Sequence, residues 1–224
     1  MLIKIRMMIK AVIFDMDGLL INSEPFWQES ETKVFNSLGI ETNKAMFEKF
    51  MGKRIDEVVD VMWEIQQWDG KSKEQVVVEI VDHVIKLVKE KGRALPGVLN
   101  TLNSFQKSTL KIGLASSSKL KIIEAVLDKL DIRSYFEIVH SAEFEEYGKP
   151  HPQTFISTAK MLDVKPNDCL VFEDSLNGVI SALAANMKCI AVPEQEATNL
   201  DKFIIADKTL SSLEDFNISN LHDL

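Results

Sequence analysis

Cysteine is scarce in this sequence, whose 224 residues include only two, Cys169 and Cys189. Both lie in apolar runs, "CLVFED" and "KCIAV", where each is expected to pack as a small buried hydrophobe. The spacing of cysteine and histidine indicates neither a disulfide framework nor a metal site of the zinc type. These absences exclude a small fold held together by disulfides or by structural zinc.

An excess of basic residues is absent too. Acidic residues outnumber basic ones by 34 to 26, and the net charge of -8 argues against broad contact with nucleic acid or an anionic membrane. An anionic substrate must therefore be held locally. The sequence has no apolar run of membrane-spanning length, and the N-terminal "MLIKIRMMIK" lacks the apolar core and cleavage site of a signal peptide. We expect a cytoplasmic protein without nucleic-acid or membrane partners.

What the sequence does contain is a regular alternation of short apolar runs and longer amphipathic ones. Nearly continuous apolar runs are typical of parallel strands covered on both faces. The alternation predicts an α/β fold: a Rossmann-like parallel sheet with helices on both faces and right-handed crossovers. Strands are predicted at 10–15, 111–116, 169–173, 188–192 and 203–206, with a further strand-like run "YFEIV" before His140; helices are predicted at 98–107, 119–130, 152–162 and 177–186.

One region interrupts this alternation. Between Ser23 and Gly92 the sequence has helical periodicity and no convincing strand, for example in "KEQVVVEIVDHVIKLVKEKG". We therefore predict a helical cap domain over residues 22–95, inserted after the first strand. The α/β core then comprises residues 9–21 and 96–224, with Pro96 and Gly97 at the second junction. Residues 1–8 form an N-terminal extension to which we assign no function.

Polar side chains follow several of the predicted strands directly. Because ligands of open parallel sheets bind at the carboxyl ends of the strands, these side chains are expected to converge on one place. The candidates, taken in chain order, are Asp15, Asp17, Ser116, Ser117, Lys149, Glu173 and Asp174.

The charges of these candidates indicate what they bind. Four carboxylates cannot all be ionised at close quarters without a cation, so an Mg²⁺ site is the simplest interpretation. The cation, Lys149 and a serine hydroxyl could then surround a phosphoryl group, with one carboxylate as nucleophile and another as general acid. Each signal alone also has a plainer explanation. "DMDG" suits a turn, the three serines suit a helix cap, and Lys149 could be a solvated surface residue.

Four motifs, "AVIFDMDG", "IGLASSS", "GKPHPQTF" and "VFEDSLNG", occur in this order. Together they resemble the signatures of the haloacid-dehalogenase-like phosphatase superfamily. More narrowly, the chain resembles the β-phosphoglucomutase-like branch, especially its sugar-phosphate phosphatases of the 2-deoxyglucose-6-phosphate and hexitol-phosphate kind. The resemblance extends from Ile9 to the C-terminus and includes the helical insert, which matches the cap of that branch.

The resemblance implies roles for the candidates. Asp15 would be the nucleophile that forms an aspartyl-phosphate, and Asp17 the general acid and base. Ser116, Ser117 and Lys149 would bind the phosphoryl group.

The resemblance also implies a magnesium site. Asp174 would complete it with the Asp15 side chain and the Asp17 backbone carbonyl, and Glu173 would act directly or through water.

Two residues of the insert bear on the substrate. The mutases of the branch carry a histidine where this sequence has Trp27, whose indole offers one N–H donor and no proton relay. Arg54 is a candidate for substrate contact when the cap closes, although it could equally balance nearby acids at the surface. The sequence therefore favours a Mg²⁺-dependent phosphomonoesterase that acts on a small sugar or polyol phosphate, and we expect a monomer. A β-phosphoglucomutase-type isomerase and a non-enzymatic phospho-receiver are the alternatives.

Overall fold

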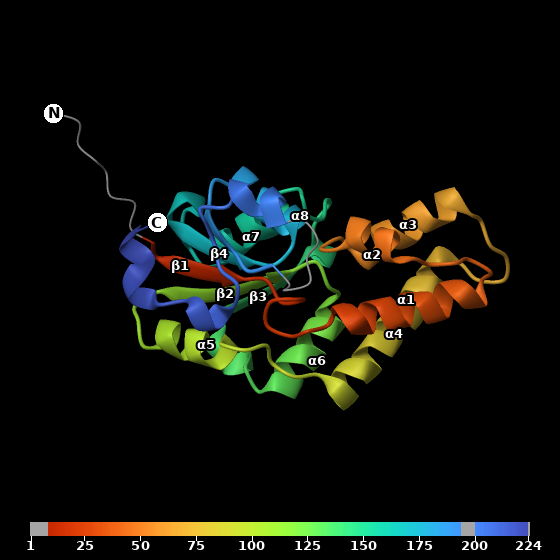
Figure 1. The fold of residues 1–224 in the computed structure, drawn as a ribbon, viewed down its shortest axis with the longest axis horizontal. Helices are drawn as coiled ribbons and strands as arrows, with labels where there is room; N and C mark the ends of the chain where they lie inside the picture. The colour runs from red at the N-terminus through yellow and green to blue at the C-terminus, as the bar shows by residue number, and fades with distance from the viewer. Residues whose placement is uncertain (1–8, 194–199, 224) are drawn as a thin grey trace.

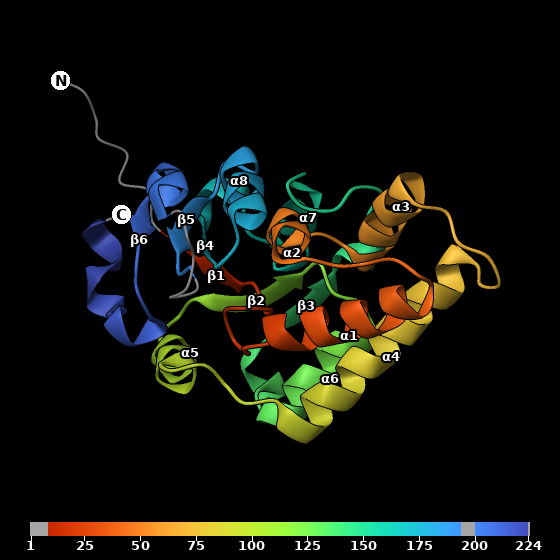
Figure 2. The same ribbon diagram turned by 45° about the vertical axis from the view of Figure 1, so that its right-hand side comes forward.

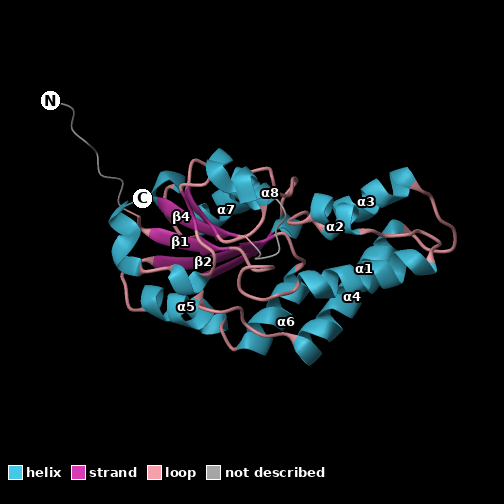
Figure 3. Ribbon diagram, in the orientation of Figure 1, coloured by secondary structure: helices cyan, strands magenta, loops and turns pink. Residues whose placement is uncertain are grey.

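The computed structural model describes residues 9–193 and 200–223 and places six parallel strands in one sheet, in the order β3-β2-β1-β4-β5-β6 (Figures 1 and 3). The strands are β1 (Ala11–Phe14), β2 (Lys111–Ser116), β3 (Ile138–Ser141), β4 (Cys169–Glu173), β5 (Lys188–Ala191) and β6 (Lys208–Thr209). The α-helices are α1 (Glu24–Ser37), α2 (Lys44–Phe50), α3 (Ile55–Ile65), α4 (Lys73–Lys91), α5 (Val98–Gln106), α6 (Leu120–Leu130), α7 (Gln153–Met161) and α8 (Leu176–Ala184). The 3₁₀ helices are η1 (Arg133–Tyr135), η2 (Ala142–Phe144), η3 (Pro166–Asp168), η4 (Leu200–Ile205), η5 (Leu213–Asp215) and η6 (Ile218–Asp223).

Alternate residues of the central strand bury opposite faces of the sheet. Val12 and Phe14 belong to the core cluster that includes residues of α5 and α6, whereas Ala11 and Ile13 pack with residues of α7 and α8. Figure 2 shows these two pairs of helices on opposite sides of the sheet. The predicted α/β fold with helices on both faces is therefore confirmed.

Helices α1 to α4, here called the cap helices, lie between β1 and β2 in sequence and project beyond one end of the sheet (Figure 1). The capping box of Ser72 and Gln75 starts α4, and the apolar side of that helix packs against α1, α3 and α6. The two chain segments that join these helices to the sheet lie side by side, because Ile21 pairs with Ala94 in an antiparallel bridge. The domain boundaries at residues 22 and 95 stay a prediction, and residues 1–8 lie outside the described residues.

One predicted strand is wrong. Residues 203–206 lie in and just after the 3₁₀ helix η4, and the last strand of the sheet begins later, at Lys208. Phe203 is buried but Ile204 is 85 % exposed, so this apolar run buries only one side chain firmly. The strand-like run before His140, in contrast, leads into β3. No helix within the described ranges has the length and apolar character needed to cross a bilayer.

Candidate active site

The site begins where β1 ends. Asp15 follows Phe14 directly, and its backbone N–H donates to the carbonyl of Phe172, so β1 and β4 stay paired up to this carboxylate. Gly18, the residue directly after Asp17, has a φ of +71°, and a Cβ there would overlap the carboxylate of Asp174. Glycine is therefore required at this turn, which brings the two loops into contact.

Lys149 lies between two carboxylates beneath this turn. Its Nζ is 2.5 Å from Asp15 Oδ1 and 2.6 Å from Glu173 Oε1, and its side chain is 1 % exposed. The other oxygen of Glu173 accepts hydrogen bonds from the backbone N–H and the hydroxyl of Ser175. Burial works to lower the pKa of Lys149, but the attraction of Asp15 and Glu173 outweighs burial and raises it. The ammonium group is therefore a fixed positive charge.

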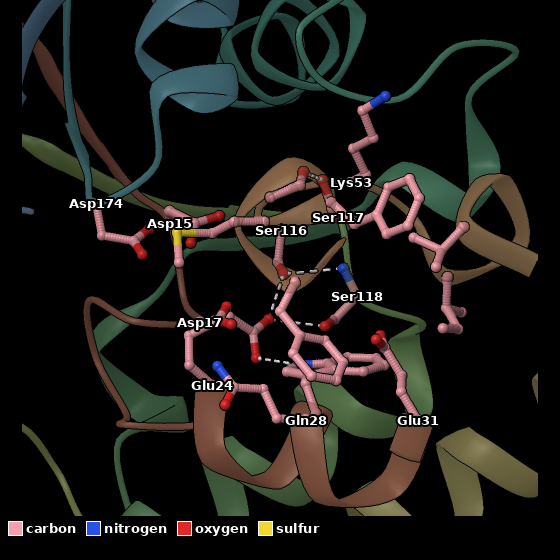
Figure 4. Close-up of a pocket in the computed structure, with 17 residues that line it drawn as sticks. Asp15, Asp17, Glu24, Gln28, Glu31, Lys53, Ser116, Ser117, Ser118 and Asp174 are labelled. Carbon is pink, nitrogen blue, oxygen red and sulfur yellow. Dashed lines mark hydrogen bonds between the residues drawn. The ribbon is translucent and has the colours of Figure 1, made fainter. Parts of the chain in front are cut away.

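Asp17 is held by hydroxyl and indole donors. Its Oδ1 accepts from Ser23 Oγ at 2.6 Å and from Trp27 Nε1 at 3.1 Å. Its Oδ2 accepts from Ser118 Oγ at 2.7 Å and from Ser116 Oγ at 3.3 Å. Ser23 and Trp27 belong to the N-cap and first turns of α1, and Ser116 and Ser118 to the end of β2 and the loop after it, so the cap helices and the sheet position this side chain together. Figure 4 shows Asp17 beside Ser116 and Ser118.

The remaining acids carry surplus negative charge. Asp15, Glu173 and Asp174 are buried, and each offers an oxygen within 4.8 Å of the others. Burial raises the pKa of Asp15 to about 8, with Lys149 opposing and Glu173 and Asp17 reinforcing the shift. Burial, then repulsion by Glu173 and Asp15, also raises the pKa of Asp174. An all-oxygen cluster with more negative charge than one lysine balances fits a divalent cation such as Mg²⁺.

A pocket opens above these groups, with a cavity of about 50 Å³. The pocket is lined by Trp27 and by five of the predicted strand-end residues. Lys149 and Glu173 do not line it, but Lys149 contacts Asp15 and Glu173 from below. The five are Asp15, Asp17, Ser116, Ser117 and Asp174. The structure thus brings the predicted strand-end residues together, and their roles stay predictions.

Arg54 is the exception. It does not line the pocket, because its guanidinium donates to the backbone carbonyls of Ala142 and Glu145 and contacts the carboxylates of Asp56 and Glu57. A side chain with these partners joins the start of α3 to the loop after β3. Contact of Arg54 with a substrate therefore stays a prediction, and in the arrangement described its guanidinium is occupied by these partners.

The sequence analysis also missed residues of the pocket. Ser23 and Ser118 hold Asp17, and Gln28, Glu31 and Lys53 line the cavity. Ser118 belongs to the serine run after β2 and could have been found there. The other residues lie in the insert, where position relative to the sheet depends on how the helices pack.

Buried carboxylates around a lysine, at the carboxyl end of a parallel sheet and beneath a helical insert, are the arrangement of a phosphoryl-transferring α/β hydrolase. Comparison agrees: the chain belongs to the haloacid dehalogenase-like hydrolase family, a model of which matches residues 12–192. Hexitol phosphatase B of Escherichia coli (strain K12) is 42 % identical over 214 residues, which cover 95 % of this chain and 96 % of that protein.

Two further relatives are more distant. Fructose-1-phosphate phosphatase YqaB of the same organism is 28 % identical, over 81 % of this chain and 95 % of the relative. The crystal structure of β-phosphoglucomutase from Clostridium difficile superposes with a TM-score of 0.86 at 26 % identity, and the match covers 96 % of each chain.

Proposed function

We propose that the chain is a Mg²⁺-dependent phosphomonoesterase that hydrolyses a small sugar or polyol phosphate through an aspartyl-phosphate on Asp15. The observation that carries this proposal is the environment of Asp15. Its carboxylate lies at the end of the central strand, one oxygen is held 2.5 Å from Lys149 Nζ, and the pocket opens above it. A carboxylate held in this way is oriented toward whatever enters the pocket.

The reaction has two steps. In the first, an Asp15 oxygen attacks phosphorus, the bond between phosphorus and the ester oxygen breaks, and Asp17 gives its proton to the leaving oxygen. In the second, water attacks the aspartyl-phosphate, Asp17 takes a proton from that water, and inorganic phosphate leaves while the Asp15 carboxylate is regenerated. The hydroxyls of Ser116 and Ser117 and the Lys149 ammonium bind phosphoryl oxygens during both steps.

Asp15 and Asp174 are the residues that would hold Mg²⁺, together with the backbone carbonyl of Asp17. Glu173 would contribute directly or through water, and its two oxygens already accept hydrogen bonds from Lys149 and Ser175. When bound, the cation neutralises charge on the phosphoryl group and on Asp15.

The substrate class follows from the relatives and from the pocket. The relatives named for phosphatase activity act on hexitol and fructose phosphates. Trp27 donates its indole N–H to Asp17 and has no second nitrogen to relay a proton, which favours transfer of the phosphoryl group to water rather than to a sugar hydroxyl.

The cap helices must move to admit such a substrate, because a cavity of about 50 Å³ holds little more than a few water molecules. Three groups of hydrogen bonds oppose this motion. Ser117 Oγ donates to the carbonyl of Gly52, Asn177 Nδ2 donates to the carbonyl of Met51, and Arg54 donates to two carbonyls of the loop after β3. The closed cap then excludes bulk water from the aspartyl-phosphate.

The experiment is a screen for phosphate release. Purified protein is incubated with sugar, polyol and nucleotide monophosphates, with Mg²⁺ and after removal of metal with EDTA. We expect release of inorganic phosphate from hexitol or hexose phosphates. This release should be lost with EDTA and restored by Mg²⁺. Conversion of β-glucose 1-phosphate to the 6-phosphate without free phosphate would replace the proposal with the isomerase. Stable labelling by acetyl phosphate without turnover would replace it with the phospho-receiver. The monomeric state and the cytoplasmic location stay predictions.

A further inference from the structure

Glu31 is a buried acid of α1 that the proposed reaction does not use. Its residue exposure is 8 %, and it lines the same pocket as Asp15. Among the residues that the structure describes, none forms a hydrogen bond or ion pair with its carboxyl group. Burial raises the pKa of this group to about 8. Because buried polar groups are normally hydrogen-bonded, an unpartnered carboxyl group that faces a pocket points to a ligand.

Glu31 lies in the part of the pocket where the non-reacting end of a substrate would bind. Trp27 and Glu31 are four residues apart on α1, so they share a face of the helix and are separated by about 6 Å along its axis. Trp27 contacts Asp17. Figure 4 shows Asp15 and Asp174 at one end of the drawn pocket and Glu31 at the other. A phosphoryl group at Asp15 therefore leaves the rest of its molecule directed toward Glu31.

The wall around Glu31 contains apolar side chains. Phe47 and Phe50 of α2 and Val58 of α3 also line the pocket, so Glu31 offers a strong hydrogen-bonding group beside apolar surface. Lys53 is the cation among the pocket residues, and its side chain points away from Glu31 in Figure 4. Above its pKa of about 8, the Glu31 carboxylate has no cation partner, so it accepts hydrogen bonds from hydroxyl groups and repels a second carboxylate.

We propose that Glu31 is a specificity-determining residue, whose carboxyl group hydrogen-bonds hydroxyl groups at the end of the substrate remote from the phosphoryl group. This inference rests on the proposed phosphatase function and narrows its substrate class. The enzyme selects neutral polyhydroxy phosphates and rejects phosphates that carry a carboxylate at the remote end.

The test compares three substrates. A hexitol 6-phosphate offers remote hydroxyl groups, 3-phosphoglycerate offers a carboxylate, and p-nitrophenyl phosphate offers neither. The variants are Glu31→Ala and Glu31→Gln. The matched control is Glu29→Gln, two residues away on the same helix, where the glutamate is about half exposed and pairs with Lys91 outside the pocket. All assays are run at pH 9, where a carboxyl group with a pKa of about 8 is mostly ionised. The measured quantity is the ratio of kcat/KM between substrates, which cancels differences in the active fraction of each preparation.

In Glu31→Ala, the kcat/KM ratio of hexitol 6-phosphate to p-nitrophenyl phosphate should fall about 10- to 100-fold, the range for a hydrogen bond to a charged group. Glu31→Gln keeps hydrogen-bonding capacity without charge, so its loss should be smaller. Its kcat/KM for 3-phosphoglycerate relative to hexitol 6-phosphate should rise about tenfold or more. The control should keep the parent ratios.

Two results would overturn the inference, and they are distinguishable. Suppose that the parent hydrolyses hexitol 6-phosphate and that both Glu31 variants keep the parent's kcat/KM ratios between substrates within about twofold. Glu31 then does not determine substrate specificity, and the proposed function stands. If the parent releases phosphate from none of the three substrates, the proposed function fails and the inference fails with it.

Discussion

Gly178 lies in the first turn of α8, directly beside the buried Glu173 carboxylate. A Cβ at this position would overlap both oxygens of that carboxylate, which is itself 0 % exposed. Helix propensity alone predicts that Gly178→Ala stabilises the protein by about 0.5–1 kcal/mol. The structure predicts the opposite, since Glu173 must leave its place and Lys149 then loses a carboxylate partner inside the protein.

The expected cost can be worked out from the contacts of Glu173. Its carboxylate accepts from Lys149 Nζ at 2.6 Å, from the Ser175 N–H at 2.8 Å and from Ser175 Oγ at 3.0 Å. Breaking one partner from a buried ion pair costs about 3–5 kcal/mol. We therefore expect Gly178→Ala to lower the free energy of unfolding by roughly 3 kcal/mol or more, which denaturation in guanidinium chloride followed by circular dichroism would measure.

A double-mutant cycle makes this prediction specific to Glu173. In a Glu173→Ala background the added methyl group meets no carboxylate, so Gly178→Ala should there be neutral or stabilising by about 1 kcal/mol. The two substitutions should be coupled by at least about 2 kcal/mol. Equal destabilisation by Gly178→Ala in both backgrounds, or an increase in stability of the parent, would refute the reasoning.

Two further predictions concern single residues. Asp15→Asn should lower kcat for phosphate release at least about 10³-fold while the circular dichroism spectrum stays unchanged, and near-parental turnover would remove Asp15 as nucleophile. Glu31→Gln should change how stability depends on pH. The carboxyl group titrates near 4.5 when unfolded and at about 8 when folded, so the parent loses stability as pH rises from 4.5 through 8. Because glutamine does not titrate, the variant should exceed the parent in free energy of unfolding by up to roughly 4–5 kcal/mol at pH 9, and this difference should nearly vanish at pH 4. A difference of the same size at both pH values in urea denaturation would contradict the assigned shift.

The sheet and its strand-end residues were predictable because their signals are local. A buried parallel strand has a continuous apolar run, and the acids of "DMDG" and "VFEDS" follow such runs directly. Residues 203–206, wrongly predicted as a strand, also form a continuous apolar run, but Ile204 and Ile205 face solvent. Whether such a run is buried depends on what packs against the segment.

The pocket wall was not predictable in the same way. Glu31 lies in a helix rich in charged residues, where a solvent-exposed position is the natural expectation, but it is buried in a pocket that residues of α2 and α3 also line. Arg54 has a long flexible side chain, and its partners Ala142 and Glu145 are about ninety positions away in the chain. Periodicity along one segment carries no information on such distant contacts.

The bridge between Ile21 and Ala94 has a consequence for how this chain can diverge. The cap helices leave and rejoin the sheet at one hydrogen-bonded point, so substitutions, insertions or deletions among them need not disturb the registers of β1 with β2 and β4. Apart from Ser23 and Trp27, which hold Asp17, the groups assigned to the reaction lie outside this segment. Exchange of the segment between Ile21 and Ala94, with a serine and a tryptophan kept at positions 23 and 27, is thus a route to a new substrate with the same reaction chemistry.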